Sequence, residues 1–457
     1  EVIVEAVLEA VHTLTTLIIL IMSDQQLLQI SPSYYAVPPE QRPSTGTVPK
    51  DVQESHGKIP LLFQPTEITC GNKKMVLKNR VIVSPMCMYS SVDGFPTPFH
   101  LVHHGQFALR GAGAIVVEAS GVSPEGRISP RDLGIYKEEH VAAHASLVSS
   151  VKSLVSGVHI GIQIAHAGRK ASTWPPYQPQ PSADHANVPT SEGGWEDNVV
   201  GASALPFDHT HVTPKELSLQ QIHEVEDDFV RAAERAFRAG YDFVQIHSAH
   251  GYLVSSFNSP LTNKRTDEYG GSFENRTRLL LNIVRRIRQQ FPDRGVWVRI
   301  NGTDGLPEDS KDESWTYEST KAVAPLLEQA GVDMLDVSSG GTVGSIQFRT
   351  SPGYQVPGAI AAKAGGLQRM RVSSVGALNG GTPDDPSREG LFAEKVLQSG
   401  DADFITLGRA FLRNPCWVED AARNLMGVNP VCVLQYGYTY PRLSPRSNAD
   451  GKGPKSS

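Results

Sequence analysis

Cysteine is scarce in this chain, which has four in 457 residues: Cys70, Cys87, Cys416 and Cys432. They are far apart in the sequence and form no C-x-x-C pair. Zinc ribbons, iron–sulfur sites and disulfide frameworks need closely spaced cysteines, so the sequence argues against all three. The scarcity fits a reducing compartment, and we expect a cytoplasmic protein.

An excess of basic charge and a long apolar run are also lacking. The 48 Asp and Glu residues outnumber the 42 Lys and Arg residues, which gives a net charge of −6. Nucleic-acid-binding domains usually carry a basic stripe, so we expect no nucleic-acid partner. The uncharged run of residues 10–23 is shorter than the about 20 residues of a spanning helix, so membrane contact is not expected. No cation precedes Arg42, and we expect neither a secretory signal nor a transit peptide.

Local composition divides the chain into three parts. Residues 31–56 are rich in Pro, Ser, Thr and Gly, so we predict that residues 1–58 are a disordered extension and linker, with Met22 as the expected start. The polar end of the chain predicts a disordered tail over residues 437–457. Residues 59–436 remain as one folded domain.

Within that domain, eight short apolar runs alternate with helical patterns. In order, the runs are NRVIVSPM, AIVVEAS, HIGIQIAHAG, DFVQIHSA, VWVRING, DMLDVSSG, RMRVSSVGAL and DFITLGR. Nearly continuous apolar runs are typical of parallel strands buried on both faces. The clearest helix starts with a capping box at Ser218, and Gly240 ends it. We expect another helix to kink or start late at Pro325.

Eight strand–helix units predict a single (β/α)8 TIM barrel of the α/β class. An open doubly wound sheet is the alternative, but no G-x-G-x-x-G follows the first strand. In a barrel, the catalytic groups gather at the carboxyl ends of the strands. The residues at those ends therefore indicate the chemistry.

The stretch QIHSAHGYL ends the fourth strand and contains His247, His250 and Tyr252. Zinc-binding histidines usually lie four residues apart on a helix with a carboxylate nearby, and this stretch offers neither feature. Two imidazole donors aimed at one substrate oxygen fit better, with Tyr252 as a proton donor. The alternative is that these side chains are only polar caps of a barrel end.

The last two strands end in Gly376, Gly408 and Arg409, a pattern that predicts a phosphate site. The alternative is that the glycines only serve tight turns. Arg299 ends the fifth strand, and because a lone buried arginine is unfavourable we expect ligand charge beside it. Gln163, in the third strand, could read the amide edge of a ring.

At these motifs the chain resembles the old yellow enzyme family of flavin-dependent ene-reductases. The most specific portion is HSAHGYLVSSFNSPLTNKRTDEYGGSFENRTR, and the resemblance extends from LLFQPTEI to PVCVLQY. SPMCMYS and IQIAHAGRKAS look like the thermophilic-like class III, which has a cysteine near the flavin. The resemblance implies a barrel that binds FMN tightly but non-covalently at its mouth, with NADPH as reductant.

Position by position, the resemblance implies roles for matching residues. The cofactor-binding residues would be Ser84, Pro85, Met86, Cys87, Ala119, Gln163, Arg299, Ser338, Ser339, Gly340, Gly376, Gly408 and Arg409. His247 and His250 would bind the carbonyl oxygen of an activated alkene, Tyr252 would protonate it, and Tyr89 would cap the substrate pocket. From the residues alone, Cys87 is equally well an inert thiol.

The implied reaction is reduction of the C=C bond of an α,β-unsaturated carbonyl compound, and the family allows a homo-oligomer. The arginine that relatives use to reach a neighbouring subunit is missing, and Tyr438 stands there instead. Two other functions stay open. One is a phosphate-binding barrel lyase or isomerase, for which Lys170 is the nearest Schiff-base candidate. The other is a flavin-binding protein with diverged activity.

Overall fold

A computed structural model describes residues 42–55, 57–178, 182–380 and 388–439 of the chain. The expected start at Met22, the apolar run of residues 10–23 and the tail from residue 440 onward lie outside the described residues. The predictions for those segments stay predictions.

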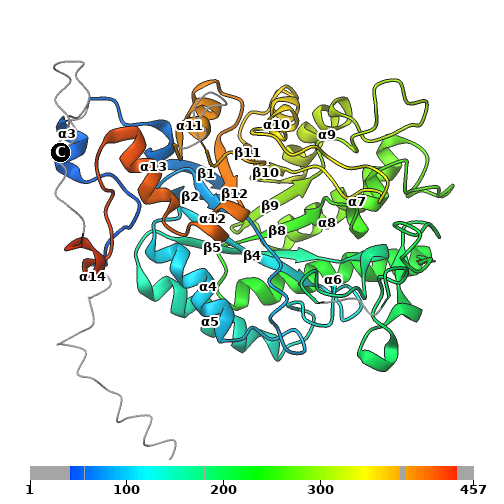
Figure 1. Ribbon diagram of the computed structural model, residues 1–457. Coiled ribbons are helices and arrows are strands. Elements are labelled where there is room, and N and C mark those ends of the chain that lie inside the picture. Colours follow the sequence, from blue (N-terminus) through cyan, green and yellow to red (C-terminus); the bar gives the residue numbers. More distant parts are fainter. Residues whose placement is uncertain (1–41, 56, 179–181, 381–387, 440–457) are drawn as a thin grey trace, which may run out of the picture. The chain divides into compact units, whose positions relative to one another are not determined.

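Eight parallel strands form a closed barrel, which confirms the predicted fold (Figure 1). All eight apolar runs of the sequence become barrel strands. They are β3 (Val81–Val83), β4 (Ala114–Gly121), β5 (His159–Ala165), β8 (Phe243–Ser248), β9 (Gly295–Ile300), β10 (Met334–Val337), β11 (Arg371–Ser374) and β12 (Phe404–Leu407). Each strand pairs with its neighbour along the chain, and β12 pairs with β3 to close the ring.

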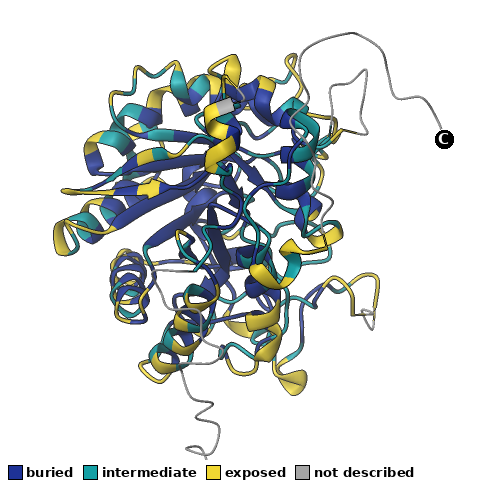
Figure 2. Cartoon of the chain, turned by 90° about the vertical axis from the view of Figure 1, so that its left-hand side faces the viewer, coloured by how far each residue is buried: buried dark blue, intermediate teal, exposed yellow. Residues whose placement is uncertain are grey.

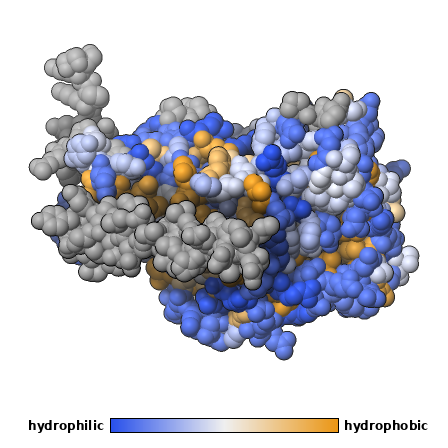
Figure 3. Space-filling view, turned by 90° about the horizontal axis from the view of Figure 1, so that it is seen from below, coloured by the Kyte–Doolittle hydropathy of each residue, from blue (hydrophilic) through white to orange (hydrophobic). Residues whose placement is uncertain are grey.

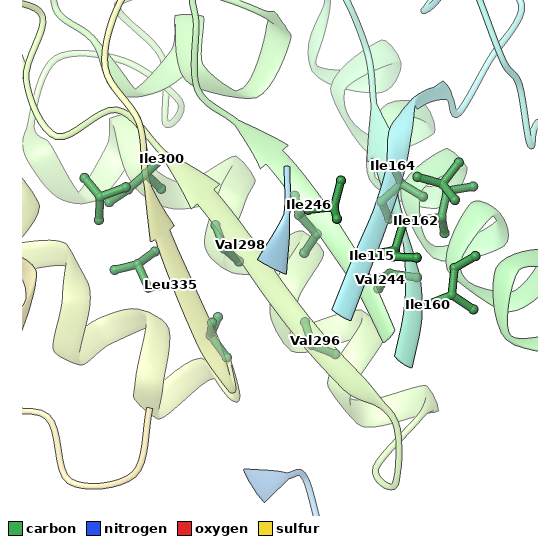
Figure 4. Packing of buried hydrophobic residues seen from close by; sticks show 14 of the residues in the cluster. Ile115, Ile160, Ile162, Ile164, Val244, Ile246, Val296, Val298, Ile300 and Leu335 are labelled. Carbon is green, nitrogen blue, oxygen red and sulfur yellow. The ribbon is translucent and has the colours of Figure 1, made fainter. Parts of the chain in front are cut away.

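Helices surround the barrel strands and bury them, so these strands are dark blue in Figure 2, whereas the helices around them also carry teal and yellow residues. The strand-covering helices are α4 (Pro98–Leu109), α5 (His140–Leu154), α6 (Leu219–Arg238), α8 (Phe273–Gln290), α9 (Tyr317–Ala330), α10 (Val356–Lys363), α11 (Leu391–Gln398) and α13 (Trp417–Met426). Isoleucine and valine side chains of the central strands fill the space between strands and helices (Figure 4). This two-sided burial explains why the strands read as apolar runs.

Helix ends follow the local signals for the most part. Ser218 caps α6 and forms the predicted capping box with Gln221. Gly240 follows the end of α6 with a φ of 92°, a conformation that favours glycine. The late start at Pro325 is wrong, because α9 begins after the cap Thr316 and continues through the proline.

The described part of the predicted linker packs against the barrel. The Thr45 hydroxyl donates to the Ala108 carbonyl oxygen over 2.8 Å, and Val48 is buried. Helix α3 (Lys50–Ser55) follows, with Val52 buried. The Gly46 N–H donates to the Val431 carbonyl over 2.8 Å. Residues 43–55 therefore differ from a linker, because their backbone finds partners on barrel loops that composition does not reveal.

A hairpin covers the amino-terminal end of the barrel. Strands β1 (Thr66–Cys70) and β2 (Lys73–Leu77) are antiparallel, and their buried side chains join a cluster with the first residues of several barrel strands. In that cluster the Phe243 and Trp297 rings stack with centroids 3.5 Å apart. Because this end is filled by apolar side chains, a polar site is left to the carboxyl end.

The face shown in Figure 3 is mostly hydrophilic, with hydrophobic side chains in several separate areas. Among the helices of the described residues, none combines the length and apolar character needed to cross a bilayer.

Candidate active site

Strand register brings the predicted residues together at the carboxyl end of the barrel. Gln163 of β5 pairs with Gln245 of β8, and His247 pairs with Arg299 of β9. Arg299 in turn pairs with Asp336 of β10. These positions are neighbours because adjacent strands pair in this register, which the sequence does not state directly.

The paired side chains form a buried polar chain across the strands. The Gln163 amide Nε2 donates to Gln245 Oε1 over 2.8 Å, and Gln245 Nε2 lies 3.5 Å from Asp336 Oδ2. Arg299 Nε donates to the same Asp336 oxygen over 2.7 Å, and its Nη2 also contacts that oxygen. Arg299 Nη2 also donates to Ser84 Oγ over 3.0 Å. All five residues are buried.

This network corrects one expectation and adds two residues. Ligand charge was expected as the counter-ion of buried Arg299, whereas the structure supplies the Asp336 carboxylate. Asp336 and Gln245 were not predicted as site residues. The available signal for Asp336 was a single acidic residue next to the end of an apolar strand, DMLDV.

The two histidines and the tyrosine form one cluster. The ring centroid of His247 lies 5.2 Å from that of His250 and 5.1 Å from that of Tyr252. Burial lowers the pKa of His250 to about 3 and the pKa of His247 well below its ordinary value, so both imidazoles are neutral at pH 7. His247 Nδ1 is buried and has no hydrogen-bond partner among the described residues.

The loop after β8 holds His250 in a constrained backbone. His250 has a φ of 62°, a left-handed conformation that is uncommon outside glycine, although asparagine, aspartate and histidine adopt it more often than other residues. Its N–H donates to Asn301 Oδ1 over 2.9 Å, and its Nε2 lies 2.9 Å from the hydroxyl of Ser338. Ser338, which the family resemblance assigns to the cofactor, therefore also contacts a substrate-binding candidate.

Lys170 lies within the site, in the 3-10 helix η3 (Gly168–Lys170) after β5. Its Nζ donates to the His250 carbonyl over 2.9 Å and to the Gly341 carbonyl over 3.3 Å. The ammonium group lies 4.8 Å from the centroid of the Tyr252 ring. Burial lowers the pKa of Lys170 to about 8. Lys170 thus connects the loops after β8 and β10.

Tyr252 lines a small cavity with His247, Ala119 and Asp132. Burial holds the pKa of the Tyr252 phenol well above its ordinary value, so the phenol is protonated at neutral pH. Burial also raises the pKa of Asp132, to about 7. Asp132 was not predicted from the sequence, because it lies in a loop rather than at a strand end.

The predicted cap and cysteine border the same region. Cys87, Tyr89 and Tyr252 pack against one apolar cluster, which Trp195 also joins. Burial holds the pKa of the Cys87 thiol well above its ordinary value, so it is a thiol and not a thiolate. The Tyr177 hydroxyl donates to the Tyr89 carbonyl over 2.7 Å, so a residue that the sequence did not single out holds the predicted cap.

A pocket of about 320 Å³ lies beside the ends of β10, β11 and β12. Four of the predicted cofactor-binding residues line it, namely Ser338, Gly376, Gly408 and Arg409. Thr350, Ser351 and Arg413 line it as well and were not predicted. Arg409 and Arg413 are exposed at α12 (Arg409–Arg413), and arginine side chains form strong hydrogen bonds with phosphate.

The remaining predicted residues lie around this pocket in different ways. Ser339 does not line it, and its Oγ accepts the Gly302 N–H over 3.0 Å. Gly340 has a φ of 121°. The sulfur of Met86 packs next to Gly408, where a Cβ added to the glycine would lie 3.5 Å from it. The donors fit FMN chemically: an arginine-lined pocket suits the phosphate, and buried amide and guanidinium groups suit the ring.

Comparison with known proteins agrees with this geometry. Residues 61–427 match the NADH:flavin oxidoreductase / NADH oxidase family, whose members are FMN oxidoreductases. The chain belongs to this family. It is therefore an oxidoreductase with FMN as its cofactor and a barrel of the old yellow enzyme type. The lyase or isomerase alternative is excluded, and Lys170 is not needed as a Schiff base.

Several relatives cover most of the chain. An NADPH dehydrogenase of Bacillus subtilis is 40% identical over 366 residues, which are 80% of this chain and 95% of the relative. An NADH:flavin oxidoreductase of Gibberella zeae is 38% identical over 416 residues, which are 89% of this chain and 94% of the relative. The solved structure of morphinone reductase superimposes with a TM-score of 0.60 at 27% identity, covering 80% of this chain and 90% of that one.

Proposed function

We propose that this old yellow enzyme family member uses NADPH to reduce the C=C bond of α,β-unsaturated carbonyl compounds. The observation that carries the proposal is the cluster of His247, His250 and Tyr252 at the same barrel end as the arginine-lined pocket. The NADPH dehydrogenase relative and the morphinone reductase complex with tetrahydroNAD support a nicotinamide reductant. Class III membership, a cytoplasmic location and a homo-oligomer stay predictions.

The cofactor would lie between two sets of residues. Gln163, Arg299 and Ser84 would face its ring, and Ser338, Gly376, Gly408 and Arg409 would bind its phosphate. Cys87, Ala119 and the Pro85–Met86 segment would border the ring, with Ser339 and Gly340 beside the phosphate. When bound, FMN would accept a hydride from NADPH and donate it to the β-carbon of the alkene.

His247 and His250 would polarise the substrate. Because burial keeps both imidazoles neutral, each has one N–H to donate. Two such donors on one carbonyl oxygen stabilise the negative charge that develops there as the β-carbon receives hydride. Tyr89 would close the pocket above the substrate.

Tyr252 would supply the proton to the α-carbon. Its raised pKa keeps the phenol protonated until a strongly basic carbon forms beside it. After the transfer, the Lys170 ammonium over the ring would stabilise the phenolate. The ammonium is held by two backbone carbonyls and so does not have to move to do this.

Anaerobic spectroscopy of the purified protein tests the proposal. We expect a yellow protein whose flavin absorbance is bleached by NADPH and restored by 2-cyclohexen-1-one. A colourless protein that cannot be reconstituted with FMN would refute the proposal. A yellow protein that NADPH bleaches and no activated alkene restores would instead establish the diverged flavin-binding protein.

A further inference from the structure

Arg299 and Asp336 form a buried ion pair in the floor of the site, with side chains 5% and 2% exposed. We propose that Asp336 is a positioning residue that fixes Arg299 against the cofactor ring, offsets its charge and thereby lowers the reduction potential of the bound FMN. The inference rests on the proposed function, because it takes Arg299 to face the ring.

The contacts fix the guanidinium on two of its three nitrogens. Nε and Nη2 both contact Asp336 Oδ2, and Nη2 also donates to Ser84. Nη1 donates to no residue in the described part of the chain. The ion pair therefore holds the guanidinium plane and leaves its remaining N–H groups for a ligand.

The charge of the pair determines its effect on the cofactor. Hydride addition brings two electrons and one proton, so the reduced ring carries one more negative charge than the oxidised ring. A lone buried arginine beside the ring would stabilise that charge and raise the potential. The adjacent Asp336 carboxylate opposes this effect, and its Oδ1 has no hydrogen-bond partner among the described residues.

The hydrogen bonds of Asp336 differ from those of Asp333, a nearby aspartate with a structural role. Asp333, just before β10, accepts the Val296 N–H over 2.8 Å and the Gly71 N–H over 3.1 Å, and pairs with Arg288. Asp336 accepts no backbone N–H from the described residues; among them it contacts the side chains of Arg299 and Gln245. Asp333 thus joins backbone segments, whereas Asp336 holds a side chain.

The two aspartates provide a matched experiment. The reduction potential of the FMN-loaded protein is measured anaerobically by equilibration with a reference dye. Asp336→Asn should raise the potential so that the equilibrium constant for reduction increases at least tenfold, about 30 mV for a two-electron couple. Asp333→Asn should lower the stability and leave the potential unchanged. Asp336→Glu keeps the negative charge, so its reduction potential should be close to that of the wild type.

Each possible outcome either supports or overturns the proposal. An unchanged or lower potential in Asp336→Asn overturns it, as does an equal shift in Asp333→Asn or in Asp336→Glu. If Asp336→Asn does not fold, Asp336→Ser is measured in its place with the same expectation. If neither neutral variant folds while Asp333→Asn does, Asp336 is structural and the proposal is wrong. Failure of the proposed function is separate, because the wild type would then bind no FMN or not be reduced by NADPH.

Discussion

The Lys170 ammonium lies 4.8 Å from the centroid of the Tyr252 ring while it donates a hydrogen bond to the carbonyl of His250. One cation thus contacts the proposed proton donor and also fixes the loop that carries a proposed substrate ligand. Lys170→Met should therefore slow reoxidation of the reduced flavin by 2-cyclohexen-1-one about tenfold, while reduction by NADPH changes little. Stopped-flow absorbance measures both half-reactions.

The control for that variant is Lys152→Met. Lys152 also donates to a backbone carbonyl, that of Gly240, and pairs with Asp242 at the opposite end of β8. It should leave both half-reactions unchanged. Equal slowing in the two lysine variants would show a general effect of destabilisation and not a role at Tyr252.

Tyr252→Phe should slow reoxidation by weakly activated enones about a hundredfold and leave reduction by NADPH intact. The reason is that the phenylalanine ring fills the same place but has no proton to give to the α-carbon. Strongly activated alkenes should be less affected, because water can protonate their product anion. Identical reoxidation rates for wild type and variant with a weak enone would remove Tyr252 from the mechanism.

The histidine pair should control binding of phenolic ligands. His247→Ala and His250→Ala should each weaken binding of 4-hydroxybenzaldehyde about ten- to a hundredfold, since each removes a donor to the phenolate oxygen. His250→Asn should bind nearly as well as wild type, because asparagine keeps an N–H donor and tolerates the φ of 62°. Ligand-induced flavin difference spectra give the affinities, and weaker binding by His250→Asn than by His250→Ala would contradict this account.

Arg409 should discriminate FMN from riboflavin. Arg409→Gln should lower the affinity of the apoprotein for FMN at least tenfold and leave the affinity for riboflavin unchanged, because only FMN carries the phosphate. Quenching of flavin fluorescence measures both. A parallel loss for the two ligands would show that Arg409 contacts the ring or supports the fold, and Arg413→Gln tests whether the second arginine of the pocket shares the phosphate.

The burial of His104 should make the free energy of unfolding decrease at acidic pH. Both ring nitrogens of His104 lack partners among the described residues, and burial, with His103, His100 and His144 nearby, holds its pKa well below 6.5. As pH falls below 6.5, the unfolded state takes up a proton that folded His104 refuses, so stability decreases. His104→Leu should remove about 1.4 kcal/mol per pH unit of this decrease. Urea unfolding between pH 6.5 and about 5 measures it.

The exposed His209 gives the control for the acid experiment. His209→Leu should leave the slope of unfolding free energy against pH unchanged, because its side chain is exposed to solvent in the folded protein. A slope in His104→Leu equal to that of the wild type would mean that His104 is protonated in the folded protein.

Much of the fold could be predicted from the sequence, because parallel strands buried on two faces leave an unmistakable apolar pattern. The positions of polar residues such as His247, His250 and Arg299 could be predicted as well, because the apolar runs show where the strands end. Their partners could not. Asp336 appears in the sequence as one acid in an apolar strand, and only the register of the closed barrel places it against Arg299.

Most of the other contacts that could not be predicted from the sequence involve loops. Lys170 and Tyr177 lie beyond strand ends, so their contacts with Tyr252 and Tyr89 depend on loop paths that no periodicity encodes. The segment of residues 43–55 has the composition of a linker, yet its backbone pairs with loops near residue 431. Partners so distant in the sequence are invisible to a local pattern.

The hairpin of β1 and β2 has a kinetic consequence. Because its side chains fill the amino-terminal end of the barrel, donor and acceptor have to enter and leave by the same mouth. In the proposed reaction both would approach the same cofactor ring from this mouth, so NADPH and the alkene would exclude each other and excess NADPH should inhibit competitively against the alkene. A barrel closed at one end in this way would favour an alternating order of substrates.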